Sequence, residues 1–434
     1  MSRSFVAVIV LAALLLPGLA LAAERFPPPE FSFDYQFPRV RVPGPRTELF
    51  AWIDVVVLLG TLGLATWLVL KKRSRLEIFL LTVFALLYFG FYRAGCVCPI
   101  GAIQNVALAI GSADYVLPVT IGLFFLLPVG FALLFGRVFC SSVCPLGAAQ
   151  EMVVLRPLRV PLWLERGLGV IPFVYLGVAV FFAWVGTDFF ICRYDPYVSF
   201  FRLDGPAHML IAGAVLLGIG TFIGRPYCRF LCPLGAIFRV LAPLSRWHVR
   251  LGGDHCVTCH LCADACPYNA IRPPTEAERT RPPSTGRATL GAIMIVIPLA
   301  IAMGALLGNA SSSLLLRASP TATLSARVYA EQEGIVEGTI EQSEAFYAQG
   351  QAAGGLHREA AEIVRRFEVG STVLGGFIGM VIGWQLLAVS LRRTRTTYEI
   401  DPAACVSCGR CYRSCPIEVA RKAGRTVTPV ETSE

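Results

Sequence analysis

The chain has 434 residues, of which 55% are hydrophobic and only 15% are charged, and its mean hydropathy is +0.63. Because soluble domains carry about 25% charged residues, this composition excludes an ordinary soluble globular protein and predicts one that spans a membrane. The formal net charge of +9 comes from Lys and Arg that flank the apolar runs, as is usual in membrane proteins, so it gives no sign of nucleic-acid binding.

The first residues have the pattern of an export signal. Residues 1–22 contain Arg3, then an apolar stretch, and end in the small-residue pattern Ala20-Leu21-Ala22, which is typical of a secretory signal peptide. An uncleaved first membrane helix is the alternative, and both interpretations place residue 24 outside the cytoplasm. The proline-rich residues 23–48 then predict an extended periplasmic segment.

Seven apolar stretches have about the 17–25 residues that a membrane-spanning helix needs. They lie near residues 49–70, 76–92, 116–135, 168–186, 207–224, 288–308 and 370–391. Lys and Arg are more frequent in the loops that this topology places inside, as the positive-inside rule expects. We therefore predict an all-α polytopic protein of a bacterial inner membrane, in which residues 49–245 form a five-helix membrane domain.

A cysteine-proline pattern recurs three times in that domain. It reads C-x-C-P at Cys96 and Cys98 and C-x3-C-P at two later places, and every copy has an arginine three residues before its first cysteine. A weaker fourth copy runs from Cys192 to Asp195 and Pro196. Proline is favoured at the first position of a helix, so the cysteine before it would lie at a helix N-terminus, where the helix dipole favours a thiolate.

The copies alternate between the outer and inner ends of the predicted spans, which predicts a parallel repeat of a two-helix unit. Such a repeat would gather four thiols at the cytoplasmic face as a metal or cluster site: Cys140, Cys144, Cys228 and Cys232. It would gather a second set at the periplasmic face: Cys96, Cys98, Cys192 and Asp195. Buried free thiols or a redox dithiol are the alternatives for the inner set, and a disulfide is the alternative for the outer one.

Two further stretches read C-x2-C-x2-C-x3-C-P, the bacterial ferredoxin pattern for a [4Fe–4S] cluster. The first, in residues 246–287, contains Cys256, Cys259, Cys262 and Cys266; the second, in residues 392–434, contains Cys405, Cys408, Cys411 and Cys415. The topology places both in the cytoplasm. Zinc is a weaker alternative, and the C-x-x-C-H at Cys256–His260 matches covalent haem attachment, which belongs to the other side of the membrane.

Residues 288–391 separate these two runs as a pair of spans with a periplasmic insert at 309–369, for which the sequence predicts helices. In two-cluster ferredoxins the fourth cysteine of each run ligates the other cluster. We therefore expect the runs to fold together as one small α+β ferredoxin-like domain, with Cys415 completing the first cluster and Cys266 the second. Each run closing its own cluster is the alternative.

Aromatic residues crowd the outer ends of the predicted spans. An interfacial aromatic belt is the simpler interpretation. A quinone pocket beside the outer cysteines is the alternative, in which Asp188, Asp195, Asp204 and His208 would handle protons.

The paired C-x3-C-P motifs and the two ferredoxin runs together resemble the membrane polyferredoxins of the NosR/NapH type, over roughly residues 49–420. The resemblance implies cluster roles for the two runs and a respiratory context of nitrous oxide or periplasmic nitrate reduction. Two features of this chain depart from it. NosR-type proteins carry a large periplasmic flavin domain before the first spans, where about 25 residues follow the predicted signal peptide here. The Cys96/Cys98 pair and the 309–369 insert have no counterpart that we can assign.

These observations predict an electron-transfer subunit. One form of this prediction is a quinol-linked oxidoreductase. Electrons would pass between two cytoplasmic [4Fe–4S] clusters, served by a cytoplasmic donor, and the quinone pool or a periplasmic redox protein, with further clusters as a relay. The alternative is a maturation factor that reduces a metal for a respiratory metalloenzyme, because copper-reductase-type proteins combine the same motifs. A redox sensor is a third class, but the sequence shows no output domain.

Overall fold

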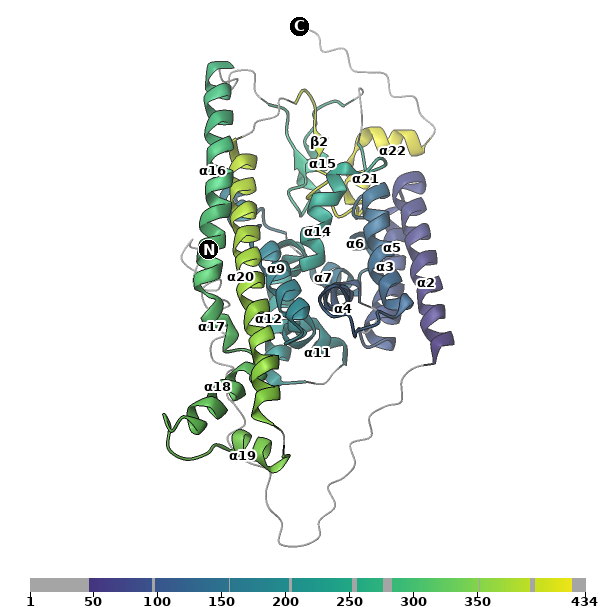
Figure 1. Cartoon of the computed structure of the whole chain (residues 1–434). Coiled ribbons are helices and arrows are strands. Elements are labelled where there is room, and N and C mark those ends of the chain that lie inside the picture. Colours follow the sequence, from purple (N-terminus) through teal and green to yellow (C-terminus); the bar gives the residue numbers. More distant parts are fainter. Residues whose placement is uncertain are drawn as a thin grey trace.

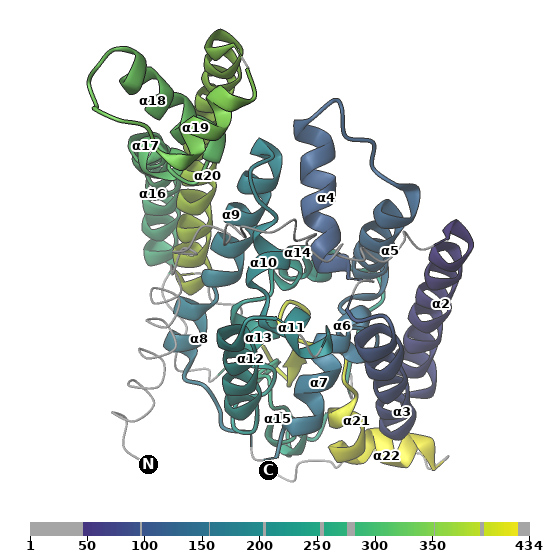
Figure 2. The same cartoon turned by 90° about the horizontal axis from the view of Figure 1, so that it is seen from below.

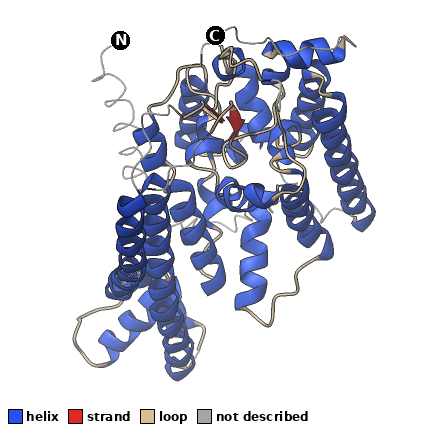
Figure 3. Ribbon diagram, turned by 90° about the horizontal axis from the view of Figure 1, so that it is seen from above, coloured by secondary structure: helices blue, strands red, loops and turns tan. Residues whose placement is uncertain are grey.

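The computed structural model describes residues 47–95, 98–155, 157–202, 205–251, 256–275, 283–350, 352–390 and 395–423. Within these ranges the chain is mostly helical, with one two-stranded sheet (Figure 3). The prediction of a mainly helical membrane protein is confirmed in this coarse form. The predicted signal peptide and almost all of the proline-rich segment lie outside the described residues.

Among the described residues, four helical stretches are long and apolar enough to cross a membrane. They are α2 (Glu48–Trp67) with the π-helical turn η2 (Leu68–Lys72), α3 (Arg75–Ala85) with η3 (Leu86–Tyr92), α8 (Leu162–Leu168) with α9 (Ile171–Val185), and most of α20 (Ala353–Ser390). A fifth candidate combines α11 (Pro196–Arg202) and α12 (Ala207–Gly220), whose axes are bent by 102°.

The predicted number of seven spans is not confirmed. Of the remaining two predicted spans, one corresponds to α5 (Val119–Phe135), an apolar helix of 17 residues, and the other lies within the 28-residue helix α16 (Pro283–Ala310), whose stretch Met294–Ala310 is apolar. Hydropathy predicts that a segment is helical and apolar, but the helix ends depend on local turns. Helix α5, for example, ends at Gly136, whose φ of 72° interrupts the helix.

Each cysteine-proline motif starts a short helix, as the sequence predicts. Proline is the first residue of α4 (Pro99–Gly111), α7 (Pro145–Val153) and α14 (Pro233–Leu241), where its missing N–H costs no hydrogen bond. The first cysteines of the two C-x3-C-P copies lie on the one-turn helices α6 (Val138–Ser142) and α13 (Pro226–Phe230), and Cys192 lies on α10 (Phe190–Tyr194). The turn η4 (Ala242–Leu244) extends α14. Figure 2 shows α4 between α5 and α9.

The two long helices α16 and α20 pack closely along their length (Figure 1). Glycines allow this approach, because a Cβ on Gly375 would lie only 2.1 Å from the carbonyl oxygen of Gly304. The insert between them folds into helices, as expected: α17 (Ser312–Leu316), α18 (Pro320–Gln332) and α19 (Glu341–Ala348). In Figure 1, α18 and α19 lie at one end of the long helices and the cysteine-rich segments lie towards the other.

The two cysteine-rich segments meet although more than a hundred residues separate them. Strand β1 (Ile271–Arg272) pairs antiparallel with β2 (Glu399–Ile400), and α15 (Leu261–Asp264) contacts α21 (Arg410–Ser414). Helix α22 (Pro416–Lys422) follows, again with proline first. The hydroxyl of Tyr412 donates a hydrogen bond to the carbonyl of Val69, 3.0 Å away, which ties α21 to the turn η2 that follows α2.

Candidate iron–sulfur sites

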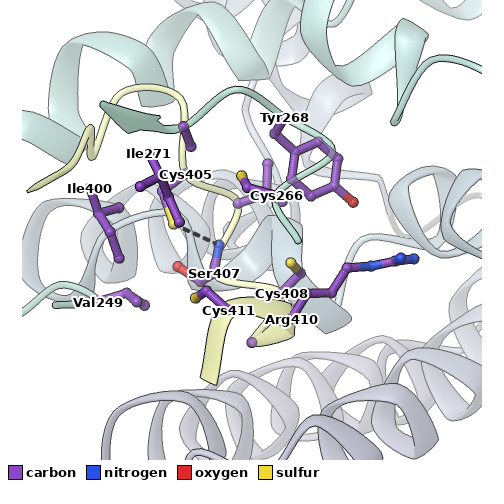
Figure 4. A pocket seen from close by; sticks show the side chains of 13 residues that line it. Val249, Cys266, Tyr268, Ile271, Ile400, Cys405, Ser407, Cys408, Arg410 and Cys411 are labelled. Carbon is purple, nitrogen blue, oxygen red and sulfur yellow. Dashed lines mark hydrogen bonds between the residues drawn. The ribbon is translucent and has the colours of Figure 1, made fainter. Parts of the chain in front are cut away.

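One cavity of about 360 Å³ is lined by four cysteines from both segments. Cys405, Cys408 and Cys411 come from the second run and Cys266 comes from the first (Figure 4). The rest of the lining is largely apolar and includes Val249. The site is therefore a buried pocket whose chemically reactive groups are mainly sulfur.

A second cavity of about 380 Å³ has the complementary set. Cys256, Cys259 and Cys262 come from the first run, and Cys415 comes from the second. Each cavity thus combines three thiols of one run with the last thiol of the other, which is the grouping that crossed ligation requires. That these thiols bind clusters remains a prediction, considered below.

The two cysteine loops have matching backbones. Thr258 and Ser407, each just before the second cysteine, have φ of 49° and 55°; His260 and Gly409, each just after it, have φ of 63° and 74°. Positive φ is costly for residues other than glycine. The same uncommon conformation at two equivalent positions in both loops indicates that the two runs are built to place three sulfur atoms in the same way.

The electrostatics of the first cavity favour a bound cation. Burial raises the pKa of the Cys405 thiol to about 12, and the neighbouring Cys408 and Cys266 thiols add to this rise. The pKa of Cys411 is also raised well above its ordinary value, by burial and by the same neighbours. Four thiolates at this spacing need compensating positive charge, which the irons of a cluster supply. The residues present therefore fit a [4Fe–4S] cluster.

The four inner thiols of the membrane domain, Cys140, Cys144, Cys228 and Cys232, are all buried. The side-chain amide of Gln150 donates to Cys228 Sγ over 3.3 Å, and the backbone N–H of Gly235 donates to Cys232 Sγ over 3.3 Å. These donors would stabilise thiolates.

The repeat is visible in the packing of two arginines. A Cβ on Gly147 would lie 3.1 Å from Nη1 of Arg225, and one on Gly235 would lie 3.6 Å from Nη2 of Arg137. Each arginine thus lies against the glycine that follows the Cys-Pro of the other copy. The two C-x3-C-P units therefore face each other, as the predicted repeat requires.

The same arginines connect the membrane thiols to the first cavity. Arg137 donates to the carbonyl of Ala403, 2.9 Å away, while its other terminal nitrogen lies 4.0 Å from Cys140 Sγ. Arg225 donates to the carbonyls of Cys140 and Ser141. Two guanidinium groups therefore lie between the membrane thiols and the second ferredoxin segment.

Glu151, on α7, is the centre of a buried charge network. It accepts from Arg75 at 2.6 Å, Arg410 at 2.9 Å, Arg225 at 3.1 Å and the hydroxyl of Tyr268 at 2.5 Å. Burial alone would raise the pKa of Glu151, but the three arginines and the tyrosine outweigh it and lower the pKa to about 2. Because Arg75 also donates to the carbonyl of Cys408, 2.8 Å away, the network reaches the ferredoxin loop.

The outer set is only partly described. Cys96 and Asp204 lie outside the described residues. Cys98 caps α4, and a Cβ on Gly101 would lie 3.5 Å from Cys192 Sγ, so the two thiols lie near the start of α4. Asp195 already accepts from the N–H of Tyr197 at 2.9 Å, at the start of α11; its ligand role remains a prediction.

The structure does not separate the inner and outer sets as the sequence suggested. Tyr227, directly before Cys228, donates a hydrogen bond to Asp195 over 2.6 Å, and Cys98 interacts electrostatically with Cys144. The two sets of thiols therefore lie close to each other rather than at opposite faces of the membrane. The reason is that the Cys-Pro helices are too short to cross a membrane, so their N-termini meet between the longer helices.

No disulfide joins two cysteines of the described ranges, and in those ranges no three His, Cys, Asp or Glu side chains converge as they would on a single metal ion. The quinone pocket beside the outer cysteines stays a prediction. Asp188 pairs with Arg193 and His208 is exposed. A large apolar cavity of about 1220 Å³ lies instead between α4, α9 and α20.

Sequence reasoning did not single out Gln104, Gln150 and Glu151. A signal was present in the repeat, because glutamine is the sixth residue after the Cys-Pro cysteine in two of the three copies. Apart from Leu146, which Gln150 contacts one helical turn away, the partners of these residues lie 74 to 259 positions away in the chain and could not be predicted from spacing.

Comparison with known proteins agrees with the motifs. Residues 117–171 and 206–252 match one family described as a 4Fe-4S binding domain, and residues 253–272 and 398–421 match a second family with the same description. The "Putative electron transport protein YccM" of Escherichia coli (strain K12) is 31% identical over 116 residues, which are 25% of this chain and 32% of YccM. "Protein NirI" of Paracoccus denitrificans is 34% identical over 125 residues, 27% of this chain and 18% of NirI. The chain is a membrane-bound protein of the polyferredoxin type.

For this polyferredoxin-type protein, the matched segments span only 32% of YccM and 18% of NirI. A shorter match, 30% over 71 residues, joins it to the "Uncharacterized protein MJ0749" of Methanocaldococcus jannaschii, covering 16% of this chain and 29% of that protein. No solved structure matches the chain. The comparisons therefore support 4Fe-4S binding domains in this chain, and its role and partners are a matter for proposal.

Proposed function

We propose that this polyferredoxin-type protein passes electrons between a cytoplasmic two-cluster [4Fe–4S] domain and the quinone pool or a periplasmic redox partner. Residues 246–287 and 392–434 would form that domain. Cys256, Cys259, Cys262 and Cys415 would hold one cluster, and Cys405, Cys408, Cys411 and Cys266 the other. Crossed ligation is supported by the lining of the two cavities.

A [4Fe–4S] cluster, when bound, takes and gives single electrons. The chain supplies its surroundings. Thiolates hold the irons, the apolar lining around Val249 and Ile271 excludes water, and the β1–β2 pair holds the two loops together. Charge on the sulfur ligands is stabilised by nearby backbone N–H groups, such as that of Ser407, 3.4 Å from Cys405 Sγ.

The observation that carries the proposal is the position of the C-x3-C-P thiols directly beneath the second ferredoxin loop. Arg137 contacts both Ala403 and Cys140, and Arg225 interacts electrostatically with both Cys228 and Cys408. About 30 Å of hydrocarbon is too far for a single electron hop, so a relay is required. Four buried thiols next to the cluster domain are suited to hold the next redox centre of the relay.

The further end of the proposed route lies at the start of α4 and at the apolar cavity beside it. The Cys98 and Cys192 thiols lie beside the inner set, and α4 connects them to the apolar cavity. That cavity is lined by residues such as Ile103, Trp184 and Phe377 and is large enough for part of an isoprenoid quinone. A quinone there would stand near the thiol sites.

Iron analysis of anaerobically purified protein tests the proposal. About eight irons per chain would mean that only the ferredoxin pair is loaded, and about twelve to sixteen would place clusters at the membrane thiols. A Cys144→Ser/Cys232→Ser variant should then lose about four irons and keep the ferredoxin signals in low-temperature electron paramagnetic resonance. Absence of any such signal after dithionite reduction would overturn the proposal, and copper at the membrane thiols would favour the maturation factor.

A further inference from the structure

The two cysteine-lined cavities of the ferredoxin segments differ in how far they are open to water. The first-run cavity is the one lined by Cys256, Cys259, Cys262 and Cys415, and its Cys259 thiol is exposed. Val257, which lines the same cavity, is 38% exposed. A soluble redox protein can therefore approach this cavity through its exposed edge.

The second-run cavity, lined by the other four ferredoxin cysteines, faces the membrane domain instead. Its Cys408 is 8% exposed, whereas Cys259, at the same place in the first run, is exposed. Arg75, at the start of α3, donates to the carbonyl of Cys408, and Arg137 donates to that of Ala403. The membrane domain thus covers the second-run loop, while water reaches the edge of the first-run cavity.

Four arginines surround the second-run loop. Arg75 and Arg137 hold carbonyls of the loop. Arg410 lines the cavity (Figure 4), and Arg225 interacts electrostatically with Cys408. All four side chains are buried or half-buried. Water therefore screens their charges only weakly, so each acts strongly on a centre in the cavity.

Glu151 is the acid that the described structure places among these arginines. It pairs with three of the four. Asp401, four residues before the first cysteine of the run, pairs with Arg272, which is not one of the four. Four positive charges against one negative charge leave a formal net charge of +3 around the second-run loop.

The charges beside the first-run cavity are paired or exposed. Asp264 pairs with Arg159, and both side chains are more than half exposed. Glu418, next to the cavity-lining Ile417, pairs with Arg73. Three further cations of α21 and α22 are exposed to water: Arg413, Arg421 and Lys422. Because water screens exposed charges, they act on the cavity less than buried charges would.

This difference in charge decides which centre holds an electron more tightly. Reduction adds one negative charge to a cluster, so fixed positive charge nearby favours the reduced form. Apolar side chains line both cavities, so their effect is similar in the two. Water at the edge of the first-run cavity also favours added charge, but it reaches one side only. The arginines of the second-run loop are held in place before the electron arrives and therefore act more strongly.

We propose that electrons enter at the first-run centre and are held preferentially by the second-run centre, so that transfer runs inward from a soluble one-electron carrier towards the inner thiols of the membrane domain. This inference rests on the proposed function and gives its route an order and a direction. Each step moves one electron, first from the carrier to the first-run centre and then to the second-run centre, and no bond is made or broken. Arg75 is a positioning residue for this order, because it contacts the second-run loop without holding a sulfur.

Separate midpoint potentials test the order of the two centres. One variant replaces the first three cysteines of the second run with serine and keeps the first-run centre, and the other does the same in the first run. Both retain the inner thiols, so the comparison includes any charge that these carry. Titration followed by electron paramagnetic resonance should give the second-run centre a potential more positive by about 59 mV or more, a tenfold preference for the electron. Equal potentials or the reverse order would overturn the proposal.

Arg75→Gln tests the role of charge in a protein that keeps both cysteine runs, so the test does not depend on the cysteine variants folding. We expect the ratio of reduced to oxidised second-run centre to fall about tenfold at a given potential, a downward shift of about 59 mV. The first-run potential should stay the same. Arg159→Gln is the matched control, because it removes an arginine paired with a carboxylate at the surface, and it should shift neither potential. An unshifted second-run potential in Arg75→Gln, or an equal shift of both centres, would contradict the proposal.

The point of entry is tested with a small soluble [2Fe–2S] ferredoxin that has been reduced with dithionite and then freed of it. In stopped-flow absorption it should reduce the variant that keeps the first-run centre several times faster than the variant that keeps the second-run centre, which the membrane domain covers. Equal rates, or faster reduction of the second-run centre, would overturn the proposal. If both centres are loaded but their order is wrong, the proposed function stands without this direction, whereas absence of both cluster signals from the unaltered protein would remove the proposed function itself.

Discussion

Glu151 and Arg225 form an ion pair in which neither side chain is exposed to solvent, with Nε and Oε2 3.1 Å apart. Arg225 begins the third copy of the cysteine-proline repeat, and Glu151 follows the Cys-Pro cysteine of the second copy by seven residues. The pair thus joins the two halves of the inner thiol site. Through Arg75 and Arg410 it also joins that site to the second ferredoxin loop.

Replacing Glu151 with glutamine should strongly destabilise the protein. The change removes the one negative charge that Arg225 and two further arginines share, and breaking a buried pair in this way costs about 3–5 kcal/mol. Thermal unfolding in detergent should show a clearly lowered midpoint. Glu359→Gln, an exposed change of the same kind on α20, is the control and should leave the midpoint nearly unchanged.

The difference in stability between the wild type and Glu151→Gln should depend on pH in a way that follows from the pKa of Glu151. Its pKa falls from an ordinary 4.5 to about 2 in the folded protein, so its stabilising contribution is complete above pH 4.5 and is lost as pH falls from there towards 2. The stability gap between the wild type and Glu151→Gln should therefore be constant from pH 8 to pH 5. The gap should shrink as pH falls from 4.5 towards 2, and a gap that stayed constant down to pH 3 would show that the pKa of Glu151 is not lowered in the folded protein.

Crossed ligation predicts which cysteine completes which cluster. In a variant lacking Cys256, Cys259 and Cys262, only the second-run cluster can form. In that background Cys415→Ser should leave the remaining paramagnetic signal intact, whereas Cys266→Ser should abolish it or change its g values, because Cys266 lines that cavity. The reverse pattern would mean that each run closes its own cluster.

The features that depend only on residues close together in the sequence could be predicted from it. The spacing of the ferredoxin cysteines is set within one loop, and Pro99, Pro145 and Pro233 start helices because of their own geometry. Relations between distant residues could not be predicted in the same way. The spacing of the copies suggested two thiol sets far apart, but the packing of short helices brings Asp195 to Tyr227.

The number of spans shows the same limit. Hydropathy found apolar stretches, yet it did not show that the helix predicted to start at residue 370 begins at Ala353, or that α11 and α12 meet at a sharp bend. Polar contacts such as those of Gln150 depend on the folded arrangement of both repeat units. Only the shared position of the two glutamines in the repeat was visible beforehand.

Arg137 should tune the potential of the centre that forms beside it. Its guanidinium lies 4.0 Å from Cys140 Sγ, and a positive charge there favours the reduced, more negative form. Arg137→Gln should lower the midpoint potential by about 40–90 mV, corresponding to about 1–2 kcal/mol for one electron. Redox titration followed by electron paramagnetic resonance measures the shift. Arg358→Gln, an equal change of charge at an exposed position, should leave the potential unaltered, and an upward shift in Arg137→Gln would contradict the expectation.

The glycine contacts of α16 and α20 should control how the second ferredoxin segment is held, because that segment follows α20 in the chain. A Cβ on Gly375 would lie 2.1 Å from the carbonyl oxygen of Gly304, whereas one on the adjacent Gly376 would meet Ala305 at an ordinary 3.8 Å. Gly375→Ala should therefore force the helices apart at a cost of about 1–3 kcal/mol. Gly376→Ala should be neutral or slightly stabilising, since alanine is the better helix former by about 1 kcal/mol.

Because both variants gain the same helix propensity, the difference between them isolates the close approach of the two helices. Thermal unfolding measures the loss of stability, and iron content measures whether the second segment still meets the first. We expect Gly375→Ala to lower both, because β2 must return to β1 for the two cavities to form. Equal behaviour of the two variants would show that the hairpin packing does not position the segment, which would then be held mainly by Glu151 and its arginines.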